Sequence, residues 1–240
     1  MKKYFFRTLI SLFSFVLLAT SCVFIGPSIR GNGNVERQTR ELDDFSAVKA
    51  SHGLEVHLVS DNKEYVVVEA DENLFEAIRT EVKGSELKIY ADKQIRSADS
   101  KKVFVHYLDI EEVRSSSGSH VITNDVLRSK SLILAASSGS HQKMEINTSR
   151  LESKCSSGAH ISIEGRSQEA TFKASSGAHL KAKNLTTRDA EADVSSGAHI
   201  TFTVLENLEG EASSGGHIYY YGNPGTTHIN KSSGGQIISR

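Results

Sequence analysis

The chain has 240 residues and carries 28 Lys and Arg against 29 Asp and Glu, a net charge of −1. This balance disfavours a general nucleic-acid binder, which needs a basic surface to offset phosphate charge, and we expect no nucleic-acid partner. Hydrophobic residues make up 38% of the chain, which is enough for a folded core. Trp is absent and only two Pro occur, so a wide core filled by large rings is not expected.

The N-terminal segment has the organisation of a secretory signal. Three basic residues within the first seven precede an apolar run over residues 9–19, and small residues follow. The run is shorter than the ~20 residues that span a membrane. The small residues before Cys22 resemble the lipobox of bacterial lipoproteins, which implies a type II signal peptide over 1–21 and a lipid-modified Cys22 that attaches the protein to the cell envelope. An ordinary signal peptide or an uncleaved anchor is the alternative.

The sequence also predicts a tether after the signal peptide and a buried position for the second cysteine. Residues 22–40 contain several Gly and no apolar period, so we expect a flexible tether there. Cys155 would be the only other thiol, and its place in the repeat described below predicts a small buried residue instead of a nucleophile.

A repeat dominates the C-terminal half. Seven copies of Ser-Ser-Gly-small-His occur, with successive final residues 21, 19, 19, 20, 18 and 19 positions apart. A period near 19 is too short for two helices and suits one coil of a β-solenoid. The copies end at His120, His141, His160, His179, His199, His217 and Gln236.

Alternation around each motif predicts which side chains face inward. Positions one and three after the His, and five and seven before it, are mostly apolar. Because successive strand residues point to opposite faces, these columns should line the core. The His and the first Ser should then point outward, and the second Ser and the small residue inward. The corner glycines should supply a positive φ or a close backbone approach; they are Gly118, Gly139, Gly158, Gly177, Gly197, Gly215 and Gly234.

The chain therefore predicts an all-β fold, a right-handed parallel β-helix of about seven regular coils over 114–240. The last copy carries Lys231 at a core position and Gln236 in place of His, as expected of a terminal cap. Residues 41–113 lack the motif but alternate in strand-like runs, with room for one short helical turn within 71–80. We expect irregular β coils there; a separate small β domain is the alternative.

Three stretches of this N-terminal part resemble a known family. The sequences over 45–56, 67–74 and 81–89, together with the Ser-Ser-Gly repeats, are similar to the putative auto-transporter adhesin, head GIN domain family. The resemblance covers roughly residues 45–238 and implies a β-helical fold and an envelope location. The adhesin label rests on fold-level analogy and carries little weight for function. This chain departs from the pattern in placing His at nearly every copy.

The outward histidines form the candidate ligand column, namely His120, His141, His160, His179, His199 and His217. Neutral imidazoles at strand spacing could share a metal ion, but no acid recurs in the motif to orient them, and a simple stacking ladder is the simpler interpretation. Tyr219 and Tyr221 should point outward near the last coils and could stack on a sugar or a partner.

These observations favour a non-enzymatic envelope lipoprotein that presents a rigid surface for adhesion or for a glycan or protein ligand, with no cofactor. A Ser-His hydrolase is disfavoured because the pair recurs in every coil without an acid or a nucleophile elbow. A glycan-acting β-helix enzyme remains an alternative and would need convergent acids in the N-terminal third. A metal-binding envelope protein is the second alternative.

Overall fold

The computed structural model of the chain describes residues 26–240, so the predicted signal peptide and Cys22 lie outside the described residues. Within this range the chain forms strands and one short 3₁₀ helix. The elements are β1 (Ser28–Arg30), β2 (Val35–Glu41), β3 (Ala47–Ala50), β4 (Glu55–Ser60), β5 (Tyr65–Asp71), η1 (Glu72–Leu74), β6 (Ile78–Lys83), β7 (Glu86–Ala91), β8 (Gln94–Ser97), β9 (Lys101–Tyr107), β10 (Glu112–Ser115), β11 (His120–Thr123), β12 (Leu127–Ala136), β13 (His141–Cys155), β14 (His160–Ala174), β15 (His179–Val194), β16 (His199–Ala212), β17 (His217–Tyr221), β18 (Thr226–Lys231) and β19 (Gln236–Ser239).

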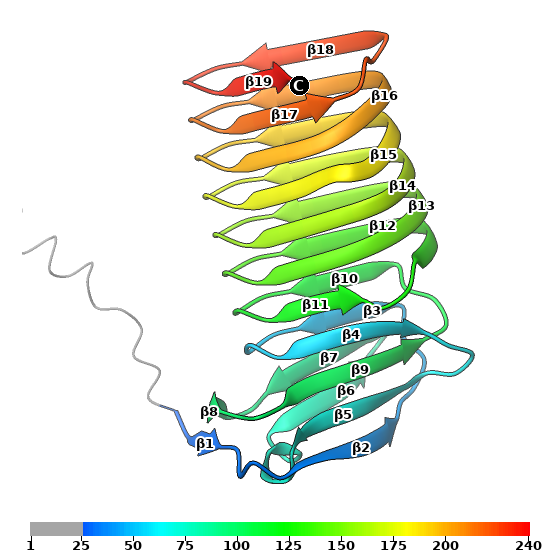
Figure 1. The fold of residues 1–240 in the computed structure, drawn as a ribbon, viewed down its shortest axis with the longest axis vertical. Helices are drawn as coiled ribbons and strands as arrows, with labels where there is room; N and C mark the ends of the chain where they lie inside the picture. The colour runs from blue at the N-terminus through cyan, green and yellow to red at the C-terminus, as the bar shows by residue number, and fades with distance from the viewer. Residues whose placement is uncertain (1–25) are drawn as a thin grey trace, which may run out of the picture.

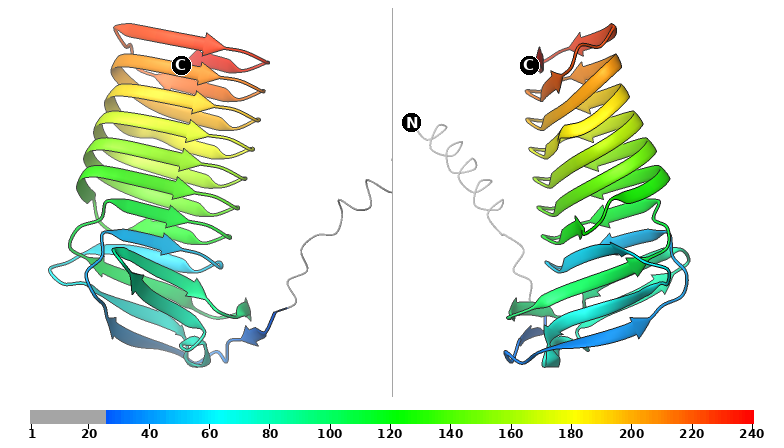
Figure 2. Two further views of the ribbon diagram at one scale, coloured as in Figure 1. Left: turned by 180° about the vertical axis from the view of Figure 1, so that it is seen from behind. Right: turned by 45° about the vertical axis from the view of Figure 1, so that its right-hand side comes forward.

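The strands wind into a right-handed β-solenoid whose coils stack along one axis (Figure 1). Each regular coil leaves a tight turn, runs along one face, bends round the far edge and returns along the other face (Figure 2). Strands β13 to β16 each cover that whole path and pair in parallel, so that His141 lies beside His160 and Cys155 beside Ala174. The predicted fold is therefore confirmed. No helix in the described part of the chain is long and apolar enough to cross a membrane.

The tight turns occupy one edge of the solenoid and share one geometry. In the turn after β13, Ser157 and Gly158 have φ angles of 52° and 67°, and the Ala159 N–H donates to the Ser156 carbonyl at 3.1 Å. Positive φ at both central residues with this hydrogen bond is the pattern of a type I′ turn. The Gly158 N–H donates to the Ser176 carbonyl of the next coil at 3.1 Å, so neighbouring turns are linked.

The orientation of the second Ser was predicted wrongly. This residue is exposed in all seven copies, because it is a central residue of the two-residue turn and projects into solvent. Period-two alternation applies along a strand and does not pass through a turn whose backbone is left-handed. The small residue before the His does point inward, and Ala159, Ala178 and Ala198 are fully buried.

The core between the two faces is thin and aliphatic. The predicted inner columns are buried in the regular coils, with small residues such as Ala174 next to the turn and larger residues farther away. Phe172 and Phe202 are the largest buried side chains, and their ring centroids lie 5.1 Å apart. The differences in repeat length are absorbed at the wide bend, where the strand register shifts between Ser162 and Glu164 and between Ala182 and Thr186.

The N-terminal part continues the same sheet. Residues 51–54 form an eighth turn of the same kind, with φ angles of 61° at His52 and 66° at Gly53, and the Gly53 N–H donates to the Ser117 carbonyl. Strands β3 and β4 on either side of this turn pair in parallel with β10 and β11, and β7 and β9 add one more layer. The short helical turn predicted within 71–80 is present as η1.

The segment expected to be a flexible tether belongs in part to this folded unit. Strand β1 pairs with β8, and β2 pairs antiparallel with β5 at the N-terminal end of the sheet. Asp71 fixes this end, since its buried carboxylate accepts hydrogen bonds from the backbone N–H groups of Gly33, Asp99 and Ser100 at 2.9–3.0 Å. Composition pointed to a linker here because the segment contains several Gly and no apolar period. The structure agrees with the second point, since β2 is almost wholly exposed.

Candidate functional site

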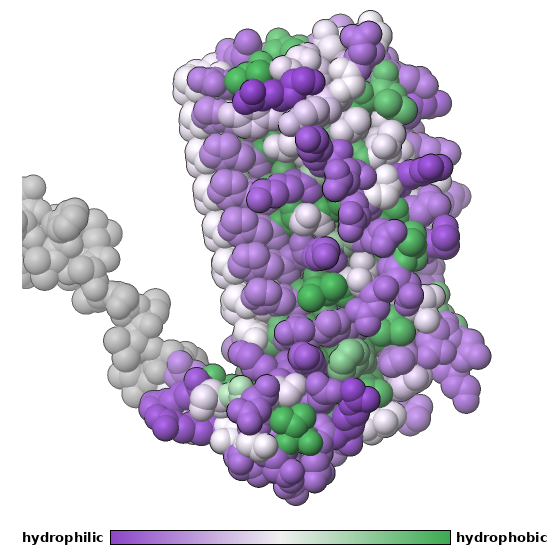
Figure 3. Space-filling model, viewed as in Figure 1, coloured by the Kyte–Doolittle hydropathy of each residue, from purple (hydrophilic) through white to green (hydrophobic). Residues whose placement is uncertain are grey.

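The six histidines predicted to form a column do so, on the face that follows each tight turn. Successive ring centroids lie 4.8, 4.8, 5.0, 4.9 and 5.0 Å apart from His120 to His217. The ring planes are within 1–22° of parallel. Figure 3 views this face and shows hydrophilic side chains repeated coil after coil beside the turn edge. We call this set of six rings the histidine ladder.

Backbone hydrogen bonds hold the ladder in register. The N–H of each ladder residue donates to a carbonyl of the preceding coil, for example from His160 to Ser140 at 2.9 Å. The spacing of the rings is therefore the spacing of the strands, about 4.8 Å. The sheet therefore fixes the backbone positions of the ladder residues, and their rings stack at this spacing.

The column has a different residue at each end. Glu55 pairs with His120 at the N-terminal end, where it takes the position of a ladder histidine in the eighth turn. Its carboxylate lies 2.7 Å from Nε2 of His57, and Nδ1 of that ring lies 3.0 Å from the side-chain oxygen of Asn124. Gln236 pairs with His217 at the other end. Sequence reasoning missed Glu55 because its turn lacks the Ser-Ser-Gly motif.

Electrostatics favour the neutral form of the ladder. Partial burial, followed by the charge of neighbouring ladder rings, lowers the pKa of His160 and His199 below the ordinary value. The pKa of His120 is lowered by the same two causes in the same order, with Glu55 opposing them. Nδ1 of His199 is buried without a hydrogen-bond partner among the described residues.

The stacked geometry does not favour a shared metal ion. The lone pair of an imidazole nitrogen lies in the plane of its ring, and the planes of His141 and His160 are parallel to within 1°. Two such planes do not meet at a common point where an ion could bind both rings. No group of three or more His, Cys, Asp or Glu side chains within residues 26–240 has an arrangement that could hold a metal.

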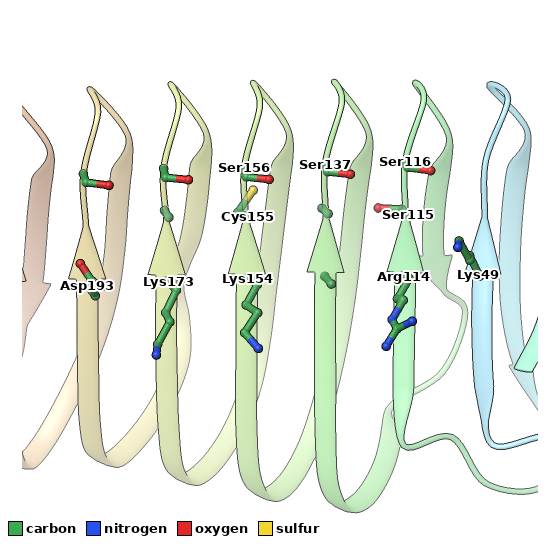
Figure 4. Close-up of a pocket in the computed structure, with 15 residues that line it drawn as sticks. Lys49, Arg114, Ser115, Ser116, Ser137, Lys154, Cys155, Ser156, Lys173 and Asp193 are labelled. Atoms are coloured by element: carbon green, nitrogen blue, oxygen red, sulfur yellow. The ribbon is translucent and has the colours of Figure 1, made fainter. Parts of the chain in front are cut away.

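The second face carries a groove that sequence reasoning did not find. It lies beside the turn edge, has a volume of about 680 Å³ and crosses six neighbouring coils. The first Ser of successive turns lines one side of it, and Figure 4 shows these hydroxyls in one row above long basic side chains. The basic residues that line it are Lys49, Arg114, Lys154 and Lys173, and Asp193 follows on the next coil. We call this feature the serine groove.

The groove arises from the repeat itself. The first Ser of each turn is small and faces outward, while the residue two positions earlier also faces outward and is long in four of these coils. A short column beside a long one leaves a channel parallel to the axis. The signal was present in the sequence as basic residues six positions before Glu55, His120, His160 and His179, although Ala135 and Asp193 take this position in the other two coils.

The thiol of Cys155 contributes to the inner side of this region but is not reactive in character. It is buried and directed toward the carbonyl of Ala159 at 3.2 Å. Burial raises its pKa to about 11, which keeps it protonated at neutral pH. This agrees with the small buried residue that the repeat predicted.

The irregular N-terminal part offers little support for a glycan-cleaving site. Several of its carboxylates are held by donor groups, such as Asp61 by Nδ1 of His106 at 2.8 Å. Asp44 and Glu64 lie close enough to interact, and burial followed by the charge of Asp44 raises the pKa of Glu64, but neither residue lines the cavity described next. A cavity of about 560 Å³ beside Tyr107 and Leu108 is lined by one carboxylate, Asp125, and by Arg128. Most glycoside hydrolases need two carboxylates that flank the scissile bond.

Comparison with known families identifies the chain. The family described as putative auto-transporter adhesin, head GIN domain, matches residues 44–224. The chain belongs to this family. The match covers both the irregular N-terminal strands and the regular coils, and it confirms the resemblance seen in the sequence. The sequence matches none of the curated proteins with which it was compared.

Solved structures share the head GIN domain fold at low sequence identity. A putative adhesin from Bacteroides fragilis is 17% identical, with a TM-score of 0.82 over 88% of this chain and 100% of that chain. A putative lipid binding protein from Parabacteroides distasonis is 21% identical, with a TM-score of 0.67 over 89% and 99%. A putative adhesin from Parabacteroides merdae is 18% identical, with a TM-score of 0.67 over 89% and 99%. At these identities the likeness concerns the fold.

Proposed function

We propose that this protein is a non-enzymatic cell-envelope lipoprotein that presents its rigid solenoid for adhesion to a glycan or protein ligand. One observation carries the proposal: polar side chains recur once per coil in straight columns and do not converge at a single point. Catalysis needs a nucleophile, a base and an orienting group at one place, whereas binding to a repetitive partner needs equivalent groups at regular intervals.

The family and the fold neighbours support the envelope part of the proposal. The family description refers to an adhesin, and two of the structures above are described as putative adhesins. An adhesin acts at the cell surface or outside it. The lipid anchor at Cys22 rests on the lipobox-like sequence and would leave the domain tethered at its N-terminal end.

A rigid surface suits this role. The long strands of neighbouring coils are hydrogen-bonded along their length, so the columns keep their spacing without a ligand. A pre-organised surface loses little conformational entropy on binding, and several weak contacts in a row add up when the partner is itself repetitive.

The test is a binding panel of glycans and matrix proteins with the purified protein, in which each bound glycan is also assayed for cleavage. We expect at least one polymeric ligand to bind and to be recovered intact. If no polymer in the panel binds, or if a bound glycan is shortened by the protein, the proposed function is wrong. The second result would support the glycan-acting alternative.

A further inference from the structure

The serine groove is long and straight, so its shape suits an extended chain better than a compact ligand. It is lined by residues of consecutive coils from Lys49 on β3 to Asp193 on β15. The basic part, from Lys49 to Lys173, covers four strand spacings, or about 19 Å. It is straight because every coil contributes the same two positions, and Figure 4 shows Arg114, Lys154 and Lys173 projecting from their strands on the same side.

The charged side chains that line the groove are mostly basic. Four basic side chains and one carboxylate line it, although the chain has a net charge of −1. Arg114 pairs with Glu112 at 2.7 Å and with Glu86 at 3.4 Å, and Lys154 pairs with Glu152 at 2.6 Å, so neighbouring carboxylates position these two cations and offset part of their charge. Among the ion pairs of the described residues, none involves Lys49 or Lys173, so both ammonium groups are available to a ligand.

The serines that line the groove supply neutral hydrogen-bonding groups. The hydroxyls of Ser137, Ser156 and Ser175 make no hydrogen bond to protein within residues 26–240. They are about 4.8 Å apart along the axis, since they occupy equivalent positions on neighbouring strands. A sugar residue in an extended β-linked polysaccharide has a similar length, so each residue of such a chain would meet one hydroxyl.

We propose that the serine groove binds an extended anionic polysaccharide, with its carboxylates or sulfates directed at Lys49, Arg114, Lys154 and Lys173 and its hydroxyls at the row of serines. The proposal rests on the proposed binding function and assigns it a ligand class and a location. Asp193 ends the basic part and sets the register of the chain along the groove. A membrane surface is a poorer fit, because a bilayer is planar and the charges here line a channel.

The experiment uses two matched probes, oligosaccharides of β-1,4-mannuronate and of neutral β-1,4-mannan, which share a backbone and differ in the carboxylate. Isothermal titration should show binding of the mannuronate oligomers alone, with an affinity that falls as salt is added. The variant with Lys154→Glu and Lys173→Glu should bind at least ten-fold more weakly. Replacing the same two residues by Arg should preserve binding, and the control variant with Lys63→Glu and Lys93→Glu should bind like the wild type. Thermal unfolding checks that each variant is folded.

Several results would overturn the proposal. If the neutral mannan binds as tightly as the mannuronate, the charge of the ligand does not determine binding. If the variant with Lys154→Glu and Lys173→Glu binds like the wild type, the ligand does not bind in the serine groove. Binding to vesicles of phosphatidylglycerol without binding to mannuronate would indicate a membrane surface instead. If another polymer of the panel binds while the groove variants have no effect, this inference fails and the proposed function stands. If no polymer binds, both fail.

Discussion

The rings of His141 and His160 lie parallel to within 1°, with their centroids 4.8 Å apart. Stacking at 4.8–5.0 Å extends through five successive pairs from His120 to His217, with the two end pairs tilted by 19° and 22°. Protonation of two neighbouring rings would place two cations at this distance, which costs about 1 kcal/mol per pair even with the dielectric constant of water. The ladder is therefore a structural element that is stable when neutral and strained when charged.

The first prediction concerns the pH dependence of stability. The folded-state pKa values of His120, His160 and His199 lie below the ordinary value, so the unfolded chain binds more protons as the pH falls through about 6.5. The contribution of the neutral ladder to the free energy of unfolding should be complete above that pH and decline below it. Urea unfolding at pH 7.5 and at pH 5.5 measures this loss of stability.

A matched pair of variants separates the ladder from other titrating groups. His160→Gln with His199→Gln should reduce the loss of stability at pH 5.5, since Gln236 already occupies the equivalent position in the last coil. His228→Gln, at an exposed site outside the ladder, should leave the loss unchanged. The same decline in both variants would show that the ladder does not control acid stability.

The second prediction concerns the left-handed serine of each turn. Ser176 has a φ of 53°, a conformation that Asn tolerates well and that β-branched residues adopt at a cost of about 1–2 kcal/mol. Ser176→Asn should therefore raise the free energy of unfolding by up to about 1 kcal/mol, because Asn-Gly is the preferred pair of a type I′ turn. Ser176→Val should lower it by about 1–2 kcal/mol. Chemical denaturation of both variants tests the turn type, and equal stabilities would contradict it.

The third prediction distinguishes two kinds of glycine. A Cβ atom at Gly158 would meet no atom within 4 Å, so Gly158→Ala should cost only the strain of its positive φ, about 1 kcal/mol. A Cβ atom at Gly165, in the wide bend, would come within 2.0 Å of the Ile146 carbonyl oxygen. Gly165→Ala should therefore cost about 3 kcal/mol or more. If the two substitutions lower the free energy of unfolding by similar amounts, the coils are not packed this closely at the bend.

The fourth prediction concerns the N-terminal end of the sheet. Asp71 accepts three backbone N–H bonds, which together lower its pKa despite burial, whose effect is to raise it. Asp71→Asn should lower the free energy of unfolding at pH 7 by about 2–3 kcal/mol. The difference from wild type should shrink below about pH 4, because the stabilisation by an ionised carboxylate with a lowered pKa is lost as the pH falls.

A surface carboxylate provides the control for this variant. Asp92 pairs with Arg79 at 2.8 Å in an exposed position, and such pairs contribute little. Asp92→Asn should change stability by less than about 1 kcal/mol. If the two variants behave alike, the buried hydrogen bonds of Asp71 do not fix this end of the fold.

The regular coils could be predicted from the sequence because each one repeats the same physical solution. The Ser-Ser-Gly motif marks the turn, and the alternation around it identifies the inner columns. The eighth turn over 51–54 was missed because His52 and Glu55 replace the second Ser and the ladder His, although the backbone adopts the same conformation. This turn keeps the glycine of the Ser-Ser-Gly turns as Gly53, and a single Gly is too weak a signal to identify a turn from the sequence.

The serine groove was missed for a different reason. Its basic side chains are dispersed between Lys49 and Lys173 in the sequence and come together only when the coils are stacked in register. Strand pairing sets the register of the coils. The depth of the groove, however, depends on how far each side chain extends beside its neighbours, which the sequence alone does not give. The residues of β2 were likewise assigned to a tether because β2 has no apolar period of its own and its pairing partner, β5, is distant in sequence.

We propose that this protein binds a repetitive partner through columns that recur once per coil. The most direct measurement is the affinity for a length series of the polymer that the binding panel selects. We expect the affinity to rise with each added unit until the columns are filled and then to change little. If the shortest fragment binds as tightly as the longest, the protein recognises its ligand at one point, and the account is contradicted.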